Sequence, residues 1–173
     1  MQSKDDCGGK QRGEMPAVAK QGEVKIRRAR RSDANSLAEL SGQLGYPATS
    51  TQIARRLGKL APASQHALFV AEVKDGGSNR GAAGGLIGWL HVSVANLVEA
   101  DTRAEVNGLV VAEGQRSLGA GARLLEAAEE WARRHGCGSV NLRSNVIRER
   151  AHKFYERQGY EHYKTQKAFR KTL

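Results

Sequence analysis

Residues 105–135 constrain the fold most narrowly, because a β-type run leads through a glycine-rich turn into the clearest amphipathic helix of the chain. The run at 105–111 is rich in valine, and residues 118–135 place apolar side chains at helical spacing. Small residues and Arg116 occupy the turn between them. A strand, a turn and a helix in direct succession predict an α/β arrangement around a sheet.

The rest of the chain predicts strands and helices in a mixed order. Alternating apolar and polar residues indicate strands, and apolar residues three and four apart indicate helices. Further strands are expected at 24–30, 67–73, 84–94, 139–143 and 163–169, with a turn at 74–78 that joins two of them as an antiparallel hairpin. Further helices are expected from Ser32 or Asp33, from near Ser50 and from Glu149.

The length of 173 residues suits one compact domain. Residues 1–22 are polar and lack periodicity, so we expect a flexible N-terminal extension followed by a single domain at 23–173. The start of the chain has no basic segment leading into an apolar one, as a secretory signal requires, which favours the cytoplasm.

Neither a membrane span nor a metal site is predicted. The longest uncharged run, residues 81–98, contains four glycines and a β-type alternation, which argues against a membrane helix. The two cysteines, Cys7 and Cys137, are far apart and lack histidines at ligand spacing. We therefore expect no metal and no disulfide.

The net charge of +10 is concentrated at residues 1–31 and 143–173. Such an excess favours an anionic partner, which could be nucleic acid, a membrane surface or a phosphorylated coenzyme, although basic ends also serve solubility alone. Aromatic residues for base stacking are scarce, at 5% of the chain, so nucleic acid ranks below a small ligand.

The turn at 110–121 is suited to a phosphate or pyrophosphate group. The first turn of a helix leaves four backbone N–H groups unpaired, at the positive end of the helix dipole. Gly119 and Gly121 would allow close approach, and Arg116 would add a charged contact; a simple loop and helix cap is the alternative. The P-loop motif is absent and the third glycine of the dinucleotide fingerprint is missing.

Two segments together resemble one family. Arg116-Ser-Leu-Gly-Ala-Gly121 is similar to the Q/R-x-x-G-x-G/A signature of the GNAT superfamily of CoA-dependent N-acetyltransferases. Residues 148–160 are similar to its second motif, A-x-x-F-Y-x-x-x-G-F/Y, with Arg148 where asparagine is frequent. The resemblance covers residues 24–173 and lies nearest to the branch that acetylates amines of small molecules, aminoglycosides among them.

The resemblance implies a GNAT-like fold of the α/β (α+β) class, with a mixed, mostly antiparallel sheet of six to seven strands flanked by about four helices. It also implies acetyl-CoA as cosubstrate, bound where the strands separate after the fourth. Pantetheine would lie along that strand like an added strand, and the pyrophosphate would meet the turn. The cofactor-binding residues implied are Leu109, Val110, Val111, Arg116, Ser117, Leu118, Gly119, Ala120, Gly121, Asn145, Ala151 and Tyr155.

The family reaction is direct attack of an amine on the acetyl thioester, without a covalent enzyme intermediate. Tyr155 matches the family's tyrosine near the sulfur and is the expected general acid, with core packing beside Phe154 as the alternative. Glu105 could take the amine proton directly or through a water, although a solvated carboxylate at a strand end explains it equally well.

The acceptor side is less constrained. Glu99 and Asp101 could attract a cationic amine, Trp89 and His91 could line its pocket unless they only pack, and Tyr46 could shape specificity from the loop between the first helices. We expect a primary amine of a small molecule. A protein or peptide amine, and a non-catalytic domain that senses CoA or binds nucleic acid, remain alternatives. The resemblance also makes a homodimer an expectation.

Overall fold

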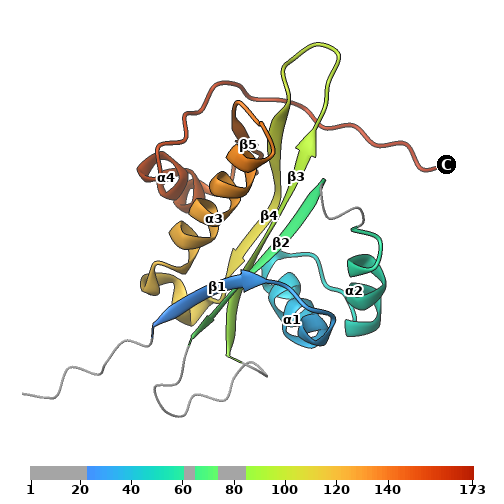
Figure 1. The fold of residues 1–173 in the computed structure, drawn as a ribbon, viewed down its shortest axis with the longest axis vertical. Helices are drawn as coiled ribbons and strands as arrows, with labels where there is room; N and C mark the ends of the chain where they lie inside the picture. Colours follow the sequence, from blue (N-terminus) through green and yellow to red (C-terminus); the bar gives the residue numbers. More distant parts are fainter. Residues whose placement is uncertain (1–22, 61–64, 74–84) are drawn as a thin grey trace, which may run out of the picture.

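The computed structural model describes residues 23–60, 65–73 and 85–173 (Figure 1). Within these ranges five strands form one sheet in the order β1-β2-β3-β4-β5. The strands are β1 Val24–Arg28, β2 His66–Val73, β3 Leu86–Ala95, β4 Arg103–Val111 and β5 Val140–Leu142. The helices are α1 Ala34–Leu44, α2 Ser50–Leu57, α3 Ala120–Arg134 and α4 Glu149–Arg157, with short 3-10 helices η1 Arg31–Asp33 and η2 Glu113–Leu118.

The first four strands pair antiparallel, and β5 pairs with β4 in the parallel sense. A parallel pair needs a crossover connection, which η2 and α3 supply. The mixed, mostly antiparallel α/β architecture expected from the sequence is therefore confirmed.

Helices cover both faces of the sheet (Figure 1). On one face α3 buries Leu124, Leu125 and Trp131 against apolar side chains of the central strands. On the other face α1 and α2 bury Leu37 and Ile53 against the same strands. Strands that are covered on both faces are apolar along much of their length. A polar side chain on such a strand is therefore a candidate for a functional role.

The start of α1 differs from the cap expected there. Asp33 occupies the N-cap position, but its side chain makes no capping hydrogen bond. Its carboxylate instead accepts two bonds from the Arg27 guanidinium, at 2.8 and 3.0 Å, and one from the Arg30 backbone N–H at 2.6 Å. The bonds from Arg27 hold the pKa of Asp33 below its usual range. This ion pair stabilises the corner where β1 turns into α1.

The strand expected at 163–169 is wrong, so the described residues form five strands rather than six or seven. After α4 the chain runs without regular structure to its end (Figure 1). Tyr163 and Phe169 remain exposed there, so a strand would gain little apolar burial. The expected turn at 74–78 and the extension at 1–22 lie outside the described residues.

No helix in the described ranges is long and apolar enough to cross a membrane. The same ranges contain no group of three histidine, cysteine or acidic side chains placed to hold a metal ion. Burial raises the pKa of the Cys137 thiol, which keeps this cysteine protonated at neutral pH.

Candidate active site

The strands β4 and β5 separate halfway along the sheet. Their pairing runs from Ala104 opposite Val140 to Val106 opposite Leu142, where β5 ends. The register between β3 and β4 shifts at the same level, which leaves Asn107 as an extra residue between Val106 and Gly108. Such a bulge bends its strand and increases the local twist. Among the described strands, none pairs with residues 107–111 of β4 on the β5 side.

We call the unpaired side of residues 107–111 of β4 the opening. The C-terminal end of α1 lies against it. The Arg148 guanidinium donates to the Leu44 carbonyl at 2.8 Å, and the Glu113 backbone N–H meets the Gln43 side-chain oxygen at 3.4 Å. A Cβ built on Gly108 would lie 3.8 Å from a Leu44 methyl group. The end of α1, the start of α4 and the segment after β4 thus meet where β4 no longer pairs with β5.

Trp89 lies on the same side of Gly108 as Leu44. A Cβ on Gly108 would approach two atoms of the Trp89 six-membered ring to 2.9 Å, closer than van der Waals contact allows. The position therefore requires glycine. The indole Nε1 of Trp89 is buried without a hydrogen-bond partner in the described part of the chain.

The turn before α3 combines a left-handed glycine with a charged side chain. Gly119 has φ of 71° and precedes the first residue of the helix, Ala120. Arg116 is exposed, donates to the Val111 carbonyl at 3.4 Å and lies 3.4 Å from the Glu113 carboxylate. Its guanidinium therefore stands beside the end of β4.

Gly121 has a packing role besides the one expected from the sequence. A Cβ at this position would lie 3.1 Å from the Phe154 ring, so the small residue lets α4 approach α3 closely. The Ser117 side chain lies outside the described part of the structure.

The other residues expected to bind the cofactor surround this turn and the opening. Leu109 and Val111 lie on the free part of β4 and pack toward the α3 side, whereas Val110 is buried. Leu118 is partly buried and Ala120 fully buried at the start of α3. Asn145 is exposed before α4, and Ala151 lies half-buried within it.

Tyr155 is half-buried on α4 between two other aromatic rings. Its ring centroid lies 5.3 Å from that of Phe154 and 6.1 Å from that of Tyr160. Burial raises the pKa of the Tyr155 phenol, and the charge of Arg148 opposes this rise. The phenol is protonated at neutral pH, as a proton donor must be.

Glu105 is buried on β4, and both of its carboxylate oxygens face arginines. Oε1 accepts from the Arg103 side chain at 2.9 Å, and Oε2 lies 3.6 Å from the Arg143 guanidinium. The solvated carboxylate considered from the sequence is therefore wrong. Both carboxylate oxygens of Glu105 therefore already interact with an arginine.

The candidate acceptor residues are only partly brought together. Trp89 and His91 lie close in sequence on β3, next to Gly108 in the neighbouring strand. The His91 Nε2 lies 3.4 Å from the His66 Nδ1, and burial, followed by the charge of His66, lowers the pKa of His91 to about 4. Tyr46 is exposed in the loop after α1.

Glu99 and Asp101 lie apart from the opening. Both are exposed in the turn beyond the last β3–β4 pair, Ala95 opposite Arg103, and this turn projects from the end of the sheet (Figure 1).

Sequence reasoning missed two features of the site. The bulge at Asn107 had one signal, Gly108 inside the strand pattern, because an isolated glycine in a strand often marks a bulge. The contact of Arg148 with α1 had one signal, the arginine at a motif position where the resembling family frequently has asparagine.

The chain is similar to known acetyltransferases in sequence over part of its length and in its fold. An aminoalkylphosphonate N-acetyltransferase from Salmonella typhimurium is 39% identical over 75 residues, which are 42% of this chain and 49% of that protein. The chain thus matches about half the length of this curated relative.

Two solved structures share the fold at low sequence identity. An aminoglycoside N-acetyltransferase in complex with CoA has a TM-score of 0.73 and 19% identity, covering 90% of this chain and 99% of its own. A glucosamine-6-phosphate N-acetyltransferase from Arabidopsis thaliana has a TM-score of 0.70 and 21% identity, covering 86% and 98%. The model of the acetyltransferase (GNAT) family matches residues 37–160, most of the chain, and this chain therefore belongs to that family.

Proposed function

We propose that this protein is an N-acetyltransferase that moves the acetyl group of acetyl-CoA to a primary amine of a small molecule, by direct attack in a ternary complex. The separation of β4 from β5 beside the turn before α3 is the observation that carries the proposal. It leaves an extended strand segment free next to a helix N-terminus and Arg116.

The chain's own residues suit the two polar parts of acetyl-CoA. The backbone of residues 107–111 would bind pantetheine as an added strand, which uses main-chain hydrogen bonds. The unpaired N–H groups at the start of α3 and the Arg116 guanidinium would bind the diphosphate. The acetyl group would then lie near Gly108, beside the end of α1.

The transfer breaks the carbon–sulfur bond and forms a carbon–nitrogen bond. A neutral amine attacks the thioester carbonyl with its lone pair, and the carbon–sulfur electron pair leaves with the sulfur. The acceptor ammonium loses two protons in total. One of them replaces the proton that Tyr155 gives to the thiolate, and the other passes to solvent, which leaves an amide and a thiol.

We assign the first proton removal to Glu105 acting through a water. Each carboxylate oxygen already faces an arginine, at 2.9 and 3.6 Å, so direct contact with an ammonium would require an ion pair to break. A water that bonds to the carboxylate avoids this cost and keeps the proton path short.

The named acceptors of the relatives differ in charge. An aminoalkylphosphonate carries an anionic group beside its amine, whereas an aminoglycoside carries several amines. The proposal therefore covers small primary amines as a class. A homodimer and a cytoplasmic location stay predictions.

Acetyl-CoA binding and thiol release test the proposal together. Binding at a hundredfold excess over Kd should stabilise the fold by about 2.7 kcal/mol, measured as a rise in Tm. Thiol release is then followed with a panel of primary amines. No shift in Tm at millimolar acetyl-CoA would overturn the proposal. A clear shift without release from any amine would favour a domain that senses CoA.

A further inference from the structure

The segment after α4 passes from one face of the sheet to the other. Tyr160 packs against the core on the α3 side, and its hydroxyl donates to the Glu129 carboxylate of α3 at 3.1 Å. The Tyr163 hydroxyl, in contrast, accepts a hydrogen bond from the Asn141 side chain of β5 at 3.2 Å. In Figure 1 the segment likewise leaves α4 on the left of the sheet and ends on the right, the side of α1 and α2. We call residues 161–173 the C-terminal arm.

Asn141 lies on the face of the sheet that points away from α3. Its neighbours in β5, Val140 and Leu142, pack against the core on the α3 side, and successive side chains of a strand point to opposite faces. Asn141 is also paired with Glu105 of β4, so the two side chains share a face. The hydrogen bond between Asn141 and Tyr163 therefore brings the start of the C-terminal arm to the strand next to the proposed base.

A row of polar side chains crosses this face of the sheet. From β2 to β5 each member lies opposite the next, and the members are His66, Ser93, Glu105 and Asn141. We call these four residues the polar row. The Ser93 hydroxyl also accepts a hydrogen bond from the Asn107 amide at 2.8 Å, which links the polar row to the bulge. The polar row thus ends at His66 on the β2 side and at the C-terminal arm on the β5 side.

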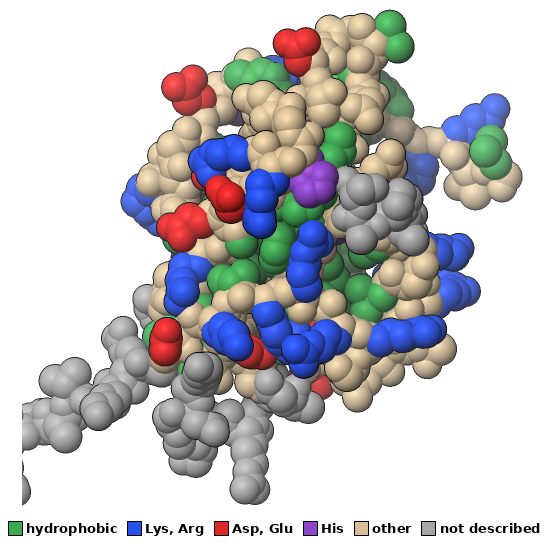
Figure 2. Space-filling model, viewed as in Figure 1, with side chains coloured by type: hydrophobic (Ala, Val, Ile, Leu, Met, Phe, Trp, Pro, Cys, Tyr) green, Lys and Arg blue, Asp and Glu red, His purple; other side chains and the backbone are tan. Residues whose placement is uncertain are grey.

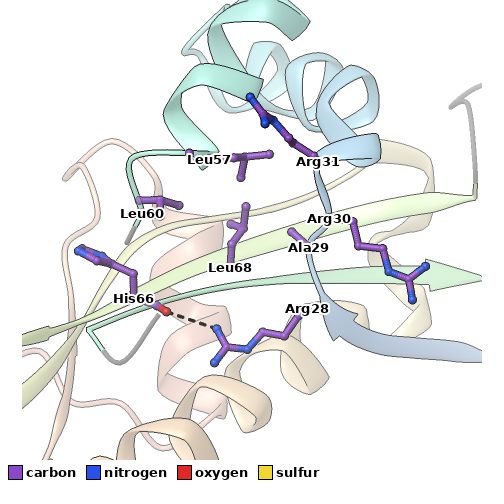
Figure 3. A pocket seen from close by; sticks show the side chains of 9 residues that line it. Arg28, Ala29, Arg30, Arg31, Leu57, Leu60, His66 and Leu68 are labelled. Atoms are coloured by element: carbon purple, nitrogen blue, oxygen red, sulfur yellow. Dashed lines mark hydrogen bonds between the residues drawn. The ribbon is translucent and has the colours of Figure 1, made fainter. Parts of the chain in front are cut away.

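The β2 end of the polar row presents no lysine among the described residues. His66 there borders a hollow of about 500 Å³, whose apolar part includes Leu57, Leu60 and Leu68 (Figure 3). Arginines also line this hollow, but a guanidinium does not lose its proton in proteins and so cannot supply the neutral amine that attacks a thioester. A lysine amine therefore has to approach the polar row from the β5 end.

Lys164 is the amine that the C-terminal arm carries to the β5 end. Its Nζ lies 5.2 Å from the centroid of the Tyr163 ring, and the hydroxyl of that ring bonds to Asn141. Contacts thus run from Lys164 through Tyr163 to the strand residue that is paired with Glu105. Lys164 is exposed and forms no ion pair in the described ranges, so its side chain is free to turn toward the opening.

The rest of the C-terminal arm is not bonded to the body of the protein. Within the described ranges, no hydrogen bond or ion pair joins residues 166–173 to another residue. Phe169 is 91% exposed, and the end of the arm projects from the body on the right of Figure 2 with Lys or Arg side chains on it. A small movement of Lys164 into the opening therefore breaks no bond farther along the arm.

We propose that the protein acetylates its own Lys164, by intramolecular transfer at the site that acetylates free amines. This inference rests on the proposed acetyl transfer and adds a modification site to it. Glu105, acting through a water, takes one proton from the Lys164 ammonium, and the neutral Nζ attacks the thioester carbonyl. The carbon–nitrogen bond forms and the carbon–sulfur electron pair leaves with the sulfur, which Tyr155 protonates. A second proton from Nζ replaces the one that Tyr155 gave.

The reaction at Lys164 ends after one turnover in each chain. Acetylation removes the positive charge of Lys164 and with it the attraction between the ammonium and the Tyr163 ring. The amide that forms is no longer a nucleophile, whereas a free amine is replaced by another after each transfer. The expected product is therefore a single acetyl group on the C-terminal arm.

Mass spectrometry of the full chain, incubated with acetyl-CoA alone, tests the proposal. Peptide mapping should find the acetyl group on Lys164, at a rate about tenfold above that at Lys167, which is exposed farther along the same arm and lacks the contact with Tyr163. The rate constant should not depend on protein concentration, because the transfer occurs within one chain. Equal rates at Lys164 and Lys167, or a rate constant that rises with protein concentration, would overturn the proposal.

Three variants locate the reaction. Lys164→Arg should abolish the labelling of the arm, and Lys167→Arg, the matched control, should keep it. Asn141→Ala removes the bond that holds Tyr163, so the rate at Lys164 should fall relative to thiol release with a free amine. Undiminished labelling of the arm in Lys164→Arg, or an unchanged ratio in Asn141→Ala, would contradict the assignment.

Competition distinguishes transfer at the site from acetylation by acetyl-CoA in solution. A primary amine that the protein turns over should slow the labelling of Lys164, because both amines use the same bound thioester. Tyr155→Phe should slow the labelling about a hundredfold, as expected for the loss of a general acid. Labelling that responds to neither change would be solution chemistry and would overturn the proposal.

Two outcomes separate this proposal from the proposed function. Thiol release with free amines, together with an unlabelled Lys164, would overturn the self-acetylation alone. A rise in Tm with acetyl-CoA, but neither thiol release nor labelling of Lys164, would instead count against acetyl transfer itself.

Discussion

The Arg148 guanidinium donates to the Leu44 carbonyl at 2.8 Å and so joins the start of α4 to the end of α1. The last carbonyl groups of a helix lack partners within the helix and carry a partial negative charge. Arg148 satisfies one of them and also opposes the rise in the pKa of Tyr155. The Arg148 side chain therefore connects the C-terminal end of α1 with Tyr155, the proposed acid.

Replacement of Arg148 should alter the pH dependence of turnover. In Arg148→Gln the charge that lowers the pKa of Tyr155 is lost, so this pKa rises further. An acid must be protonated to act, and the alkaline fall in kcat should therefore move to higher pH. A pH–rate profile measures the shift. Arg150→Gln, exposed on the same helix, serves as control, and an unmoved profile in Arg148→Gln would argue against the coupling.

Removal of the Tyr155 hydroxyl should slow the reaction without weakening CoA binding. Tyr155→Phe keeps the ring between Phe154 and Tyr160 but cannot protonate the thiolate. We expect kcat to fall about a hundredfold, within the usual contribution of general acid catalysis. Steady-state rates and calorimetry with acetyl-CoA check both parts. Tyr163→Phe, exposed near the end of the chain, should behave as wild type, and wild-type turnover in Tyr155→Phe would remove the acid role.

A methyl group at Gly108 should destabilise the site. Its Cβ would lie 2.9 Å from two atoms of the Trp89 ring, so Gly108→Ala forces the indole to move. Overpacking of this kind costs about 1–3 kcal/mol, which urea unfolding measures. Gly114→Ala, with nothing within 4 Å of its Cβ, is the control. Trp89→Leu in the Gly108→Ala background should reduce the extra cost; no reduction would show that the clash is elsewhere.

Neutralising Arg116 should weaken acetyl-CoA binding and leave the fold intact. Arg116 is exposed and its ion pair with Glu113 is long, at 3.4 Å, so Arg116→Gln removes little from stability. Loss of a charged contact to the diphosphate should raise the Kd of acetyl-CoA about tenfold. Calorimetry measures this change. Arg133→Gln, on the exposed side of α3, should bind normally, and the same Kd in both variants would exclude the contact.

Stability should fall as the pH drops toward the pKa of His91. Burial lowers this pKa from 6.5 to about 4, so the unfolded chain takes up a proton that the folded chain does not. The contribution of His91 is full above pH 6.5 and is lost between 6.5 and 4. This loss lowers the free energy of unfolding by about 2–3 kcal/mol, which urea unfolding across this pH range measures.

The His91→Gln variant isolates this effect. Its free energy of unfolding should depend less steeply on pH than that of the wild-type protein, whatever packing energy the substitution costs. His162→Gln, exposed near the end of the chain, should keep the wild-type dependence. Parallel curves for His91→Gln and the wild-type protein would contradict the low pKa.

The helices and central strands were predictable because their signals are local. Leu37 and Leu40 share one helical face and are both buried, and the turn at Gly119 leads into α3 at Ala120 as expected. The expected strand around Tyr163 failed for the opposite reason. A β-type pattern indicates only that a segment suits an extended conformation, and a strand forms only where another strand offers its edge.

The candidate site residues stay predictions that the resemblance to the family implies. The structure places Arg116 beside the end of β4 and Tyr155 on α4. The two ion pairs of Glu105 were not predictable, because Arg143 reaches it from a different strand.

Local patterns in the amino-acid sequence were sufficient to indicate the family, to predict the element order as far as α4 and to predict the charged turn before α3. Only the packed chain reveals the bulge at Asn107, the hydrogen bond from Arg148 to the end of α1 and the ion pairs of Glu105. The physical reason is the range of the forces involved. Periodicity and capping act over a few residues, whereas a pocket or an ion pair depends on the register of strands that are distant in sequence.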